Sequence, residues 1–107
     1  MRSNIACIHA AVAAAVVTLL LAGCGERTDA EIVESARTKL QTNERQTAII
    51  ELKTVLQRSP QSGTARVVLG QALLDGGAPA LAMVELEKAR ELKHDDNAVV
   101  PPLARAM

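Results

Sequence analysis

The sequence has no phenylalanine, tyrosine or tryptophan among its 107 residues, and its formal net charge is zero. Proteins that bind single-stranded nucleic acid without sequence preference stack the bases on aromatic side chains and attract the phosphates with a basic surface. This chain has neither feature, so its composition argues against that class of protein. It also has no polybasic run that would draw it to anionic lipid.

Cysteine is scarce as well, with only Cys7 and Cys24. An even number of cysteines would permit a disulfide, but both lie in or beside an apolar block, residues 5–21, that follows the basic Arg2. This block is shorter than the ~20 residues that usually span a bilayer. A basic start, an apolar stretch and small residues at its end are the parts of a secretory signal peptide.

The residues at the end of this block, Leu-Ala-Gly-Cys at 21–24, closely resemble the lipobox of bacterial lipoproteins. The resemblance implies a signal peptide over residues 1–23, cleavage before Cys24, a covalent lipid on Cys24 and a short tether over 24–28. Cleavage would remove Cys7, which leaves no disulfide partner. The alternative is an uncleaved N-terminal membrane anchor, and both alternatives place the rest of the chain outside the cytoplasm.

The residue after the lipobox cysteine is Gly25 and not aspartate. By resemblance to the sorting rule of proteobacterial lipoproteins, this favours the periplasmic side of the outer membrane over the inner membrane.

The chain after Cys24 repeats with a period of 34 residues. At this offset, residues of the same kind coincide: Leu40 with Leu74, Ala48 with Ala82, Leu52 with Leu86, Ala36 with Gly70, Gly70 with Ala104, and Leu69 with Leu103; Arg37 returns as Arg105 after two periods. A period of this length is that of the tetratricopeptide repeat (TPR), in which each repeat is a pair of helices.

The residues at the repeat positions resemble the TPR pattern. The second repeat has its hallmark residues at Leu69, Gly70, Leu73, Ala82, Leu86 and Ala89, and the first has Ala48, Leu52, Val55 and Pro60 on its second helix. The first helix is degenerate, because Ser35 and Lys39 stand where leucine and tyrosine are usual. Terminal repeats commonly deviate in this way.

The resemblance predicts an all-α TPR solenoid of about two and a half repeats, namely 29–62, 63–96 and the start of a third over 97–107. Because about three repeats are needed for stability, we expect the chain to be the N-terminal part of a longer array or a truncated product. A plain helical bundle with an accidental period is the alternative.

Local signals predict where the helices begin and end. Capping boxes are expected at Thr28 with Glu31 and at Asn43 with Gln46. Turns are expected at Ser59-Pro60 and at Gly76-Gly77. Pro79 and the pair Pro101-Pro102 are expected near the starts of two helices.

The sequence offers little for catalysis or metal binding. After cleavage its only histidine is His94, which has no second histidine or cysteine near it and is expected in a solvated turn. The carboxylates Glu31, Glu34, Glu51, Glu85, Glu87 and Glu91 are expected on exposed helix faces. We therefore expect no catalytic residues, no metal site and no cofactor apart from the lipid on Cys24.

What remains is a concave surface on the first helix of each repeat, where TPR proteins bind extended peptides or partner helices. The resemblance maps the partner-binding groove to Val33, Arg37, Leu40 and Gln41 in the first repeat and to Val67, Gln71, Leu74 and Asp75 in the second, with Ala30 and Thr64 beside them. The Lys/Asn clamp that holds a C-terminal carboxylate in some chaperone-binding TPRs is absent, so a carboxylate-tail ligand is not supported. We expect protein or peptide partners, and neither nucleic acid nor a small-molecule substrate.

Several segments look similar to one family, the TPR lipoproteins of the PEP-CTERM/exosortase system, which are found beside exopolysaccharide genes. These segments are 48–53, 56–60, 65–66, 69–70, 84–89 and 102–106. The resemblance implies a periplasmic scaffold for PEP-CTERM protein sorting or exopolysaccharide export. Two alternatives stay open: a TPR lipoprotein of outer-membrane assembly or pilus biogenesis, and an enzyme whose catalytic domain follows Met107.

Overall fold

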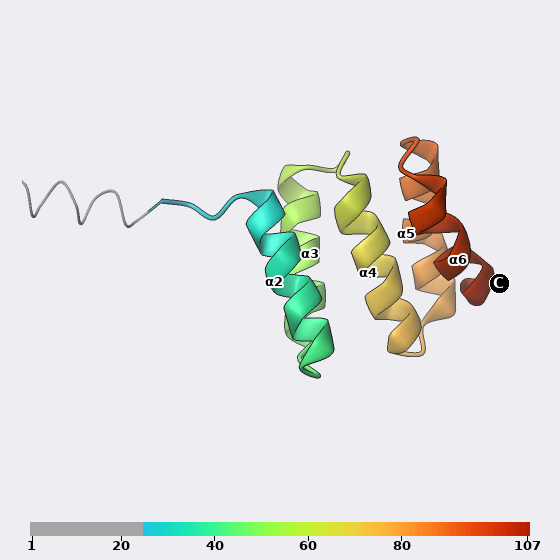
Figure 1. Cartoon of the computed structure of the whole chain (residues 1–107), viewed down its shortest axis with the longest axis horizontal. Helices are drawn as coiled ribbons and strands as arrows, with labels where there is room; N and C mark the ends of the chain where they lie inside the picture. Colours follow the sequence, from blue (N-terminus) through green and yellow to red (C-terminus); the bar gives the residue numbers. More distant parts are fainter. Residues whose placement is uncertain (1–24) are drawn as a thin grey trace, which may run out of the picture.

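The computed structural model describes residues 25–107, and their regular secondary structure is entirely helical (Figure 1). The elements are α2 (Asp29–Gln41), α3 (Arg45–Arg58), α4 (Gly63–Asp75), α5 (Pro79–Glu91) and α6 (Asp96–Ala106). The predicted all-α class is therefore confirmed for this part of the chain. The predicted signal peptide and Cys24 lie outside the described residues.

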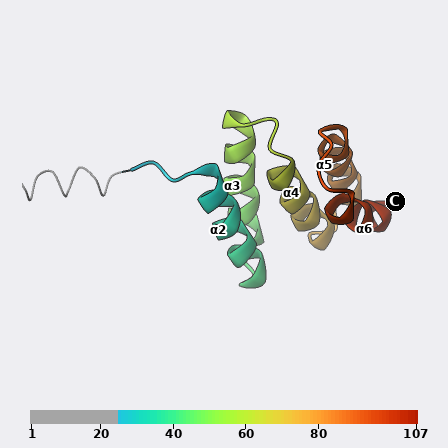
Figure 2. The same ribbon diagram turned by 45° about the horizontal axis from the view of Figure 1, so that its top comes forward.

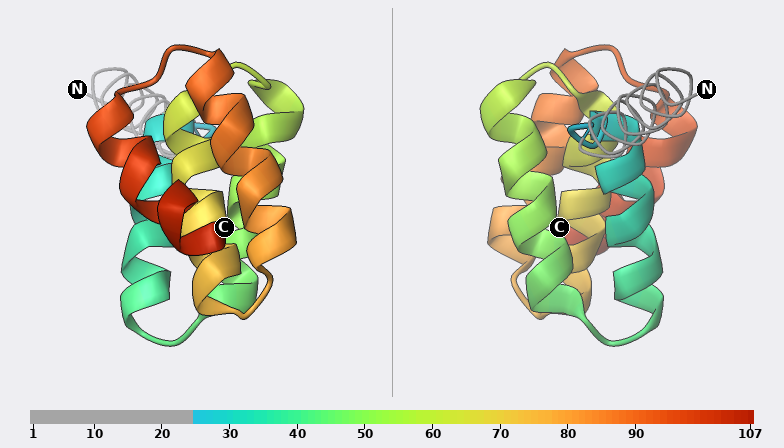
Figure 3. Two further views of the ribbon diagram at one scale, coloured as in Figure 1. Left: turned by 90° about the vertical axis from the view of Figure 1, so that its right-hand side faces the viewer. Right: turned by 90° about the vertical axis from the view of Figure 1, so that its left-hand side faces the viewer.

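Each helix packs against its neighbours in the chain, and two further contacts join α2 to α4 and α4 to α6. By contrast, α3 and α5, as described, contact only the helices that precede and follow them. The turned view in Figure 2 shows the successive helices side by side. In Figure 3, α2 and α6 lie on one side of the array and α3 and α5 on the other.

The 34-residue period of the sequence is also present in the backbone. Helix α2 begins at Asp29 and α4 at Gly63, 34 residues later, and the next helices, α3 and α5, begin at Arg45 and Pro79 with the same offset. Between the helices of each pair, one residue has a positive φ: Asn43 at 63° and Gly77 at 78°, again 34 residues apart.

The buried positions follow the same register. Val33 and Val67 are each 4% exposed, while Ala48 with Ala82 and Leu52 with Leu86 are completely buried. Three positions of α4 recur on α6 as Val99, Pro102 and Leu103, where α4 has Ala65, Val68 and Leu69. Residues with the same repeat position therefore occupy the same place in successive packing layers.

Close packing between α4 and α5 depends on Gly70. A Cβ atom at this position would lie 2.6 Å from Cγ of Leu86, which is closer than real Cβ contacts allow. The missing side chain therefore makes room for a completely buried leucine of the next helix. The leucine removes apolar area from water, which stabilises the packing by roughly 25 cal/mol per Å² of area buried.

The predicted capping signals are right at one helix and wrong at another. Thr28 Oγ1 accepts a hydrogen bond from the backbone N–H of Glu31 at 3.2 Å, and the Glu31 carboxylate accepts one from Thr28 N–H at 2.7 Å. At α3 the expected capping box of Asn43 and Gln46 does not form. Glu44 is the N-cap and makes no side-chain capping bond, because Asn43 adopts the left-handed conformation of the preceding turn.

The prolines behave in two ways. Pro79 occupies the first turn of α5, where its missing N–H leaves no intrahelical bond unmade. Pro101 and Pro102 were expected near a helix start, but α6 already begins at Asp96 and both lie inside it. They remove two N–H donors from the hydrogen-bond ladder of the helix, while Pro102 is buried against the array.

Candidate functional site

Two hollows lie along α2 and α4, and the second also reaches α6. The first, of about 250 Å³, is lined by residues of the N-terminal parts of the two helices, namely Asp29, Ala30, Val33, Glu34, Ser62 and Thr64. The second, of about 330 Å³, is lined by residues of three helices, namely Arg37, Leu40, Gln41, Val68, Gln71, Asp75 and Arg105.

Most of the predicted groove residues gather in these hollows. Five of them, Arg37, Leu40, Gln41, Gln71 and Asp75, line the second hollow, and Val33 lines the first. Val33 is nevertheless only 4% exposed and belongs to the core cluster around Leu52. The other two line neither hollow: Val67 is 4% exposed, Leu74 is partly buried, and both pack in the core cluster around Leu86. Val67 and Leu74 therefore contribute packing rather than a surface open to a partner.

Two residues of the second hollow were absent from the predicted groove, Val68 and Arg105. Arg105 lies on α6, which the sequence assigned only to the start of a third repeat. The signal for it was its spacing, because Arg105 occupies the same repeat position as Arg37 and Gln71.

The charged groups of the second hollow form loose pairs. Arg37 Nε lies 3.1 Å from a carboxylate oxygen of Glu34, and Arg105 Nη2 lies 3.4 Å from Oδ1 of Asp75. The arginine side chains are 43% and 64% exposed. Exposed pairs of this kind contribute about 0–1 kcal/mol each, so a ligand carboxylate could compete with either partner.

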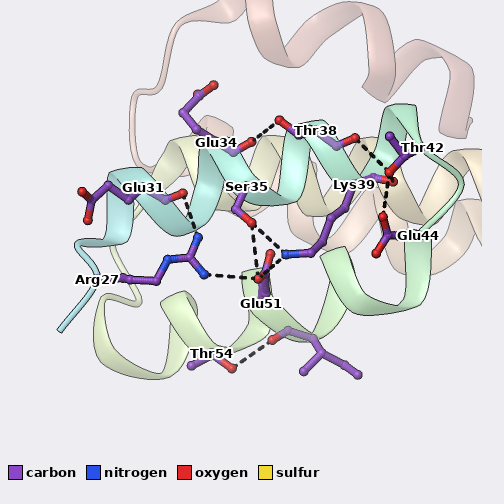
Figure 4. Close-up of polar contacts among 11 residues, drawn as sticks. Arg27, Glu31, Glu34, Ser35, Thr38, Lys39, Thr42, Glu44, Glu51 and Thr54 are labelled. Atoms are coloured by element: carbon purple, nitrogen blue, oxygen red, sulfur yellow. Dashed lines mark hydrogen bonds and ion pairs between the residues drawn. The ribbon is translucent and has the colours of Figure 1, made fainter. Parts of the chain in front are cut away.

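A polar network joins α2 to α3 on another face of the molecule (Figure 4). Lys39 Nζ donates to Oε1 of Glu51 at 2.6 Å and to the Ser35 hydroxyl at 2.8 Å, and that hydroxyl donates to the same carboxylate oxygen at 3.4 Å. Arg27 Nη1 adds an ion pair with Oε1 of Glu51 at 3.6 Å. Ser35 and Lys39, the two deviations from the repeat pattern, thus share one carboxylate as their partner.

The expectation that Glu51 lies on an exposed face is wrong, because its side chain is 18% exposed. Burial raises the pKa of this carboxyl group, but the hydrogen bond and charge of Lys39, with Ser35 and Arg27, outweigh burial and lower the pKa below 4.5. The second oxygen, Oε2, is buried and has no hydrogen-bond partner within residues 25–107.

Glu85, the counterpart of Glu51 one period later, is also 18% exposed and was likewise expected on an exposed face. Its carboxylate pairs with Nη1 of Arg66 at 2.6 Å, joining α4 to α5. The guanidinium of Arg66 also donates to the carbonyl oxygen of Pro60, with Nη2 at 2.8 Å and Nε at 3.2 Å. Both glutamates therefore link the two helices of a pair.

His94 lies in the turn between α5 and α6 and is half-buried against the start of α4. A Cβ atom added to Gly63 would come within 2.6 Å of its Nδ1 atom, so the imidazole packs directly on the helix backbone. No group of three or more histidine, cysteine, aspartate or glutamate side chains in the described part of the chain is placed to hold a metal ion.

Comparisons with known proteins gave no match: no protein-family model matches the sequence, and no curated protein or solved structure matches it significantly. Within residues 25–107, no helix is long and apolar enough to cross a membrane.

Proposed function

We propose that this chain is a TPR-type scaffold that binds a protein or peptide partner in the groove between α2, α4 and α6. The observation that carries the proposal is the second hollow, where one repeat position supplies Arg37, Gln71 and Arg105 from the alternate helices α2, α4 and α6. Helical-repeat arrays create extended binding surfaces by stacking equivalent helices in this way. The role proposed is binding and not catalysis.

The proposal includes an anchor at the N-terminus. The lipobox-like residues support a covalent lipid on Cys24, with α2 beginning only five residues later at Asp29. The scaffold would then be held at a membrane surface on the periplasmic side, and Gly25 after the cysteine supports the outer membrane. Stable anchoring requires more than one acyl chain, which a triacylated cysteine provides.

For the biological setting, we propose PEP-CTERM protein sorting or exopolysaccharide export. The support is the resemblance of the segments at 48–53, 56–60 and 84–89 to the TPR lipoproteins of that system. A scaffold of outer-membrane assembly or pilus biogenesis would have the same anchor and repeats, so the two settings differ in the identity of the partner.

In-cell photo-crosslinking tests the scaffold directly. A photo-reactive amino acid replaces Gln71 in the second hollow, and the matched control replaces Thr47, an exposed residue of α3 outside both hollows. The full-length chain is expressed in its native host, and a Cys24→Ser variant shows which products depend on the anchor.

We expect discrete crosslinked partners from position 71 and none of the same partners from position 47. Polysaccharide-export or PEP-CTERM proteins would support the proposed setting, whereas barrel-assembly or pilus components would replace it with the other. Equal products from both positions would show that the groove is not the binding surface. Unchanged membrane attachment of Cys24→Ser would refute the lipid anchor.

A further inference from the structure

The second hollow has a charge pattern that indicates what kind of partner it accepts. Arg37 and Arg105 are separated by two periods, and Gln71 lies at the same repeat position between them. All three line one hollow, although they come from α2, α4 and α6. The hollow thus presents two guanidinium groups and an amide from three equivalent positions.

Most of the polar groups in this hollow are able to donate hydrogen bonds. Arg37 makes its ion pair with Glu34 through Nε, and Arg105 makes its pair with Asp75 through a single Nη atom. A guanidinium has five N–H donors, so each arginine retains further donors. Asp75 is the only acidic residue lining this hollow, against two arginines.

The other polar and apolar groups favour a peptide. Gln41 and Gln71 each carry a donor and an acceptor, which is what the N–H and C=O groups of an extended backbone require. Leu40, which is partly buried, provides apolar surface for the intervening side chains, whereas Val68 is completely buried beneath the hollow's lining. The chain has no aromatic residue on which a sugar ring could stack, so a polysaccharide is the less suitable occupant.

We propose that the second hollow binds an extended peptide with acidic residues at alternate positions, whose side-chain carboxylates contact Arg37 and Arg105. In an extended chain, successive side chains point to opposite sides, so alternate acidic residues present their carboxylates on one face. Arginine suits this role because its planar guanidinium holds a carboxylate through two parallel hydrogen bonds. This inference rests on the proposed scaffold and specifies the chemistry of its partner.

The test uses the full-length lipidated chain in detergent micelles and a fluorescein-labelled peptide of alternating Glu and Ala. Amidation of the peptide's C-terminus leaves only side-chain carboxylates, and fluorescence anisotropy measures binding. The double variant Arg37→Gln/Arg105→Gln should bind at least about tenfold more weakly, the scale of one lost charge-assisted hydrogen bond. The matched control is Arg90→Gln, which removes an exposed arginine of α5 outside the second hollow and should leave the affinity unchanged.

A third variant, Gln71→Arg, gives a result that a merely structural role would not produce. It places a third guanidinium at the central position and should tighten binding of the Glu/Ala peptide several-fold. Circular dichroism checks whether each variant keeps the helical content of the parent chain. Raising the salt concentration should weaken binding, because salt screens exposed charges.

The acidic-peptide proposal would be overturned by no binding of the Glu/Ala peptide to the parent chain, by equal binding of a Lys/Ala peptide, or by equal affinity of the double arginine variant and Arg90→Gln. Alginate, a polyuronate, is the competing ligand, and tighter binding of alginate than of the peptide would assign the hollow to acidic polysaccharide instead. If partners still crosslink at position 71 in the double arginine variant, the proposed scaffold function is retained and only the proposed acidic ligand is rejected.

Discussion

The pair α2–α3 and the pair α4–α5 have the same backbone register but hold their helices together differently. In the second pair, Gly70 makes room for Leu86, and Leu69 and Leu73 pack in the core cluster that α4 shares with α2 and α3. In the first pair, the positions of those two leucines are taken by Ser35 and Lys39, which bond to Glu51 instead. These two repeat positions therefore hold packed leucines in one pair and side chains bonded to a carboxylate in the other.

Some buried residues have the same character in both helix pairs and set the distance between the helices, whereas others differ from one pair to the other. The small residues Ala36 and Gly70 and the leucines Leu52 and Leu86 keep their character in both pairs, and all four are buried. Close approach of two helices needs a small residue opposite a large one, since protein interiors are packed with few voids. The remaining positions can hold polar side chains, provided that each buried charge is paired with an opposite charge.

The largest expected effect tests whether equivalent positions carry equivalent energies. Leu52→Ala and Leu86→Ala each empty a completely buried site and should lower the free energy of unfolding by ~2–5 kcal/mol. Chemical denaturation followed by circular dichroism measures both losses, with the exposed Leu81→Ala as the control. A small loss at one leucine and a large loss at the other would show that the two pairs do not share a packing plan.

The next largest effect concerns the Lys39–Glu51 ion pair, which joins α2 to α3. Lys39→Met removes the main partner of Glu51 and should destabilise the chain by ~1–2 kcal/mol, because a largely buried carboxylate then lacks its charge-assisted hydrogen bond. The double variant Lys39→Met/Glu51→Leu, which makes the site apolar, should recover most of that stability. A double variant less stable than Lys39→Met alone would contradict this interpretation of the network.

A smaller effect depends on pH. The pKa of Glu51 is lowered in the folded chain, so its stabilising contribution is complete above the ordinary value of 4.5 and is lost as the pH falls through the lower folded value. Glu31, whose pKa is lowered by hydrogen bonds from the Thr28 backbone and side chain, acts in the same direction.

Thermal melts of the parent chain and of Glu51→Gln from pH 6 to pH 3 measure this dependence. The parent should lose more stability than the variant as the solution is acidified. Parallel curves would mean that the network makes no net contribution at neutral pH.

The smallest effect concerns the two turns. Asn43 and Gly77 both have positive φ, a conformation that glycine adopts freely and asparagine tolerates best among the other residues. Exchanging them, as Asn43→Gly or Gly77→Asn, should change stability by less than ~1 kcal/mol, whereas Gly77→Val should cost clearly more. Equal tolerance of valine would show that the turn relaxes to another conformation.

Much of the fold follows from local signals in the sequence. The capping box at Thr28, the turn at Gly76 and Gly77, and the proline that opens α5 all act over a few residues, so their outcome needs no knowledge of distant contacts. The capping box expected at Asn43 does not form, because Asn43 itself adopts the positive φ of the turn and so cannot serve as the N-cap of α3. For the candidate groove, the resemblance to the repeat pattern mapped Arg37 and Gln71, which line the second hollow, but also Val67 and Leu74, which pack in the core.

The sequence by itself determined the helical period, the small and large residues that recur with it, and the equivalence of Arg37, Gln71 and Arg105. All three features depend only on spacing along the chain. Because an α-helix has 3.6 residues per turn, that spacing decides which face of the helix each residue occupies. Only the tertiary structure decided that Glu51 and Glu85 bridge helices and that α6 brings Arg105 into the same hollow as Arg37. The partner of a charged side chain depends on how close and at what angle two helices pack, and those quantities are fixed by the whole set of buried contacts rather than by any local segment.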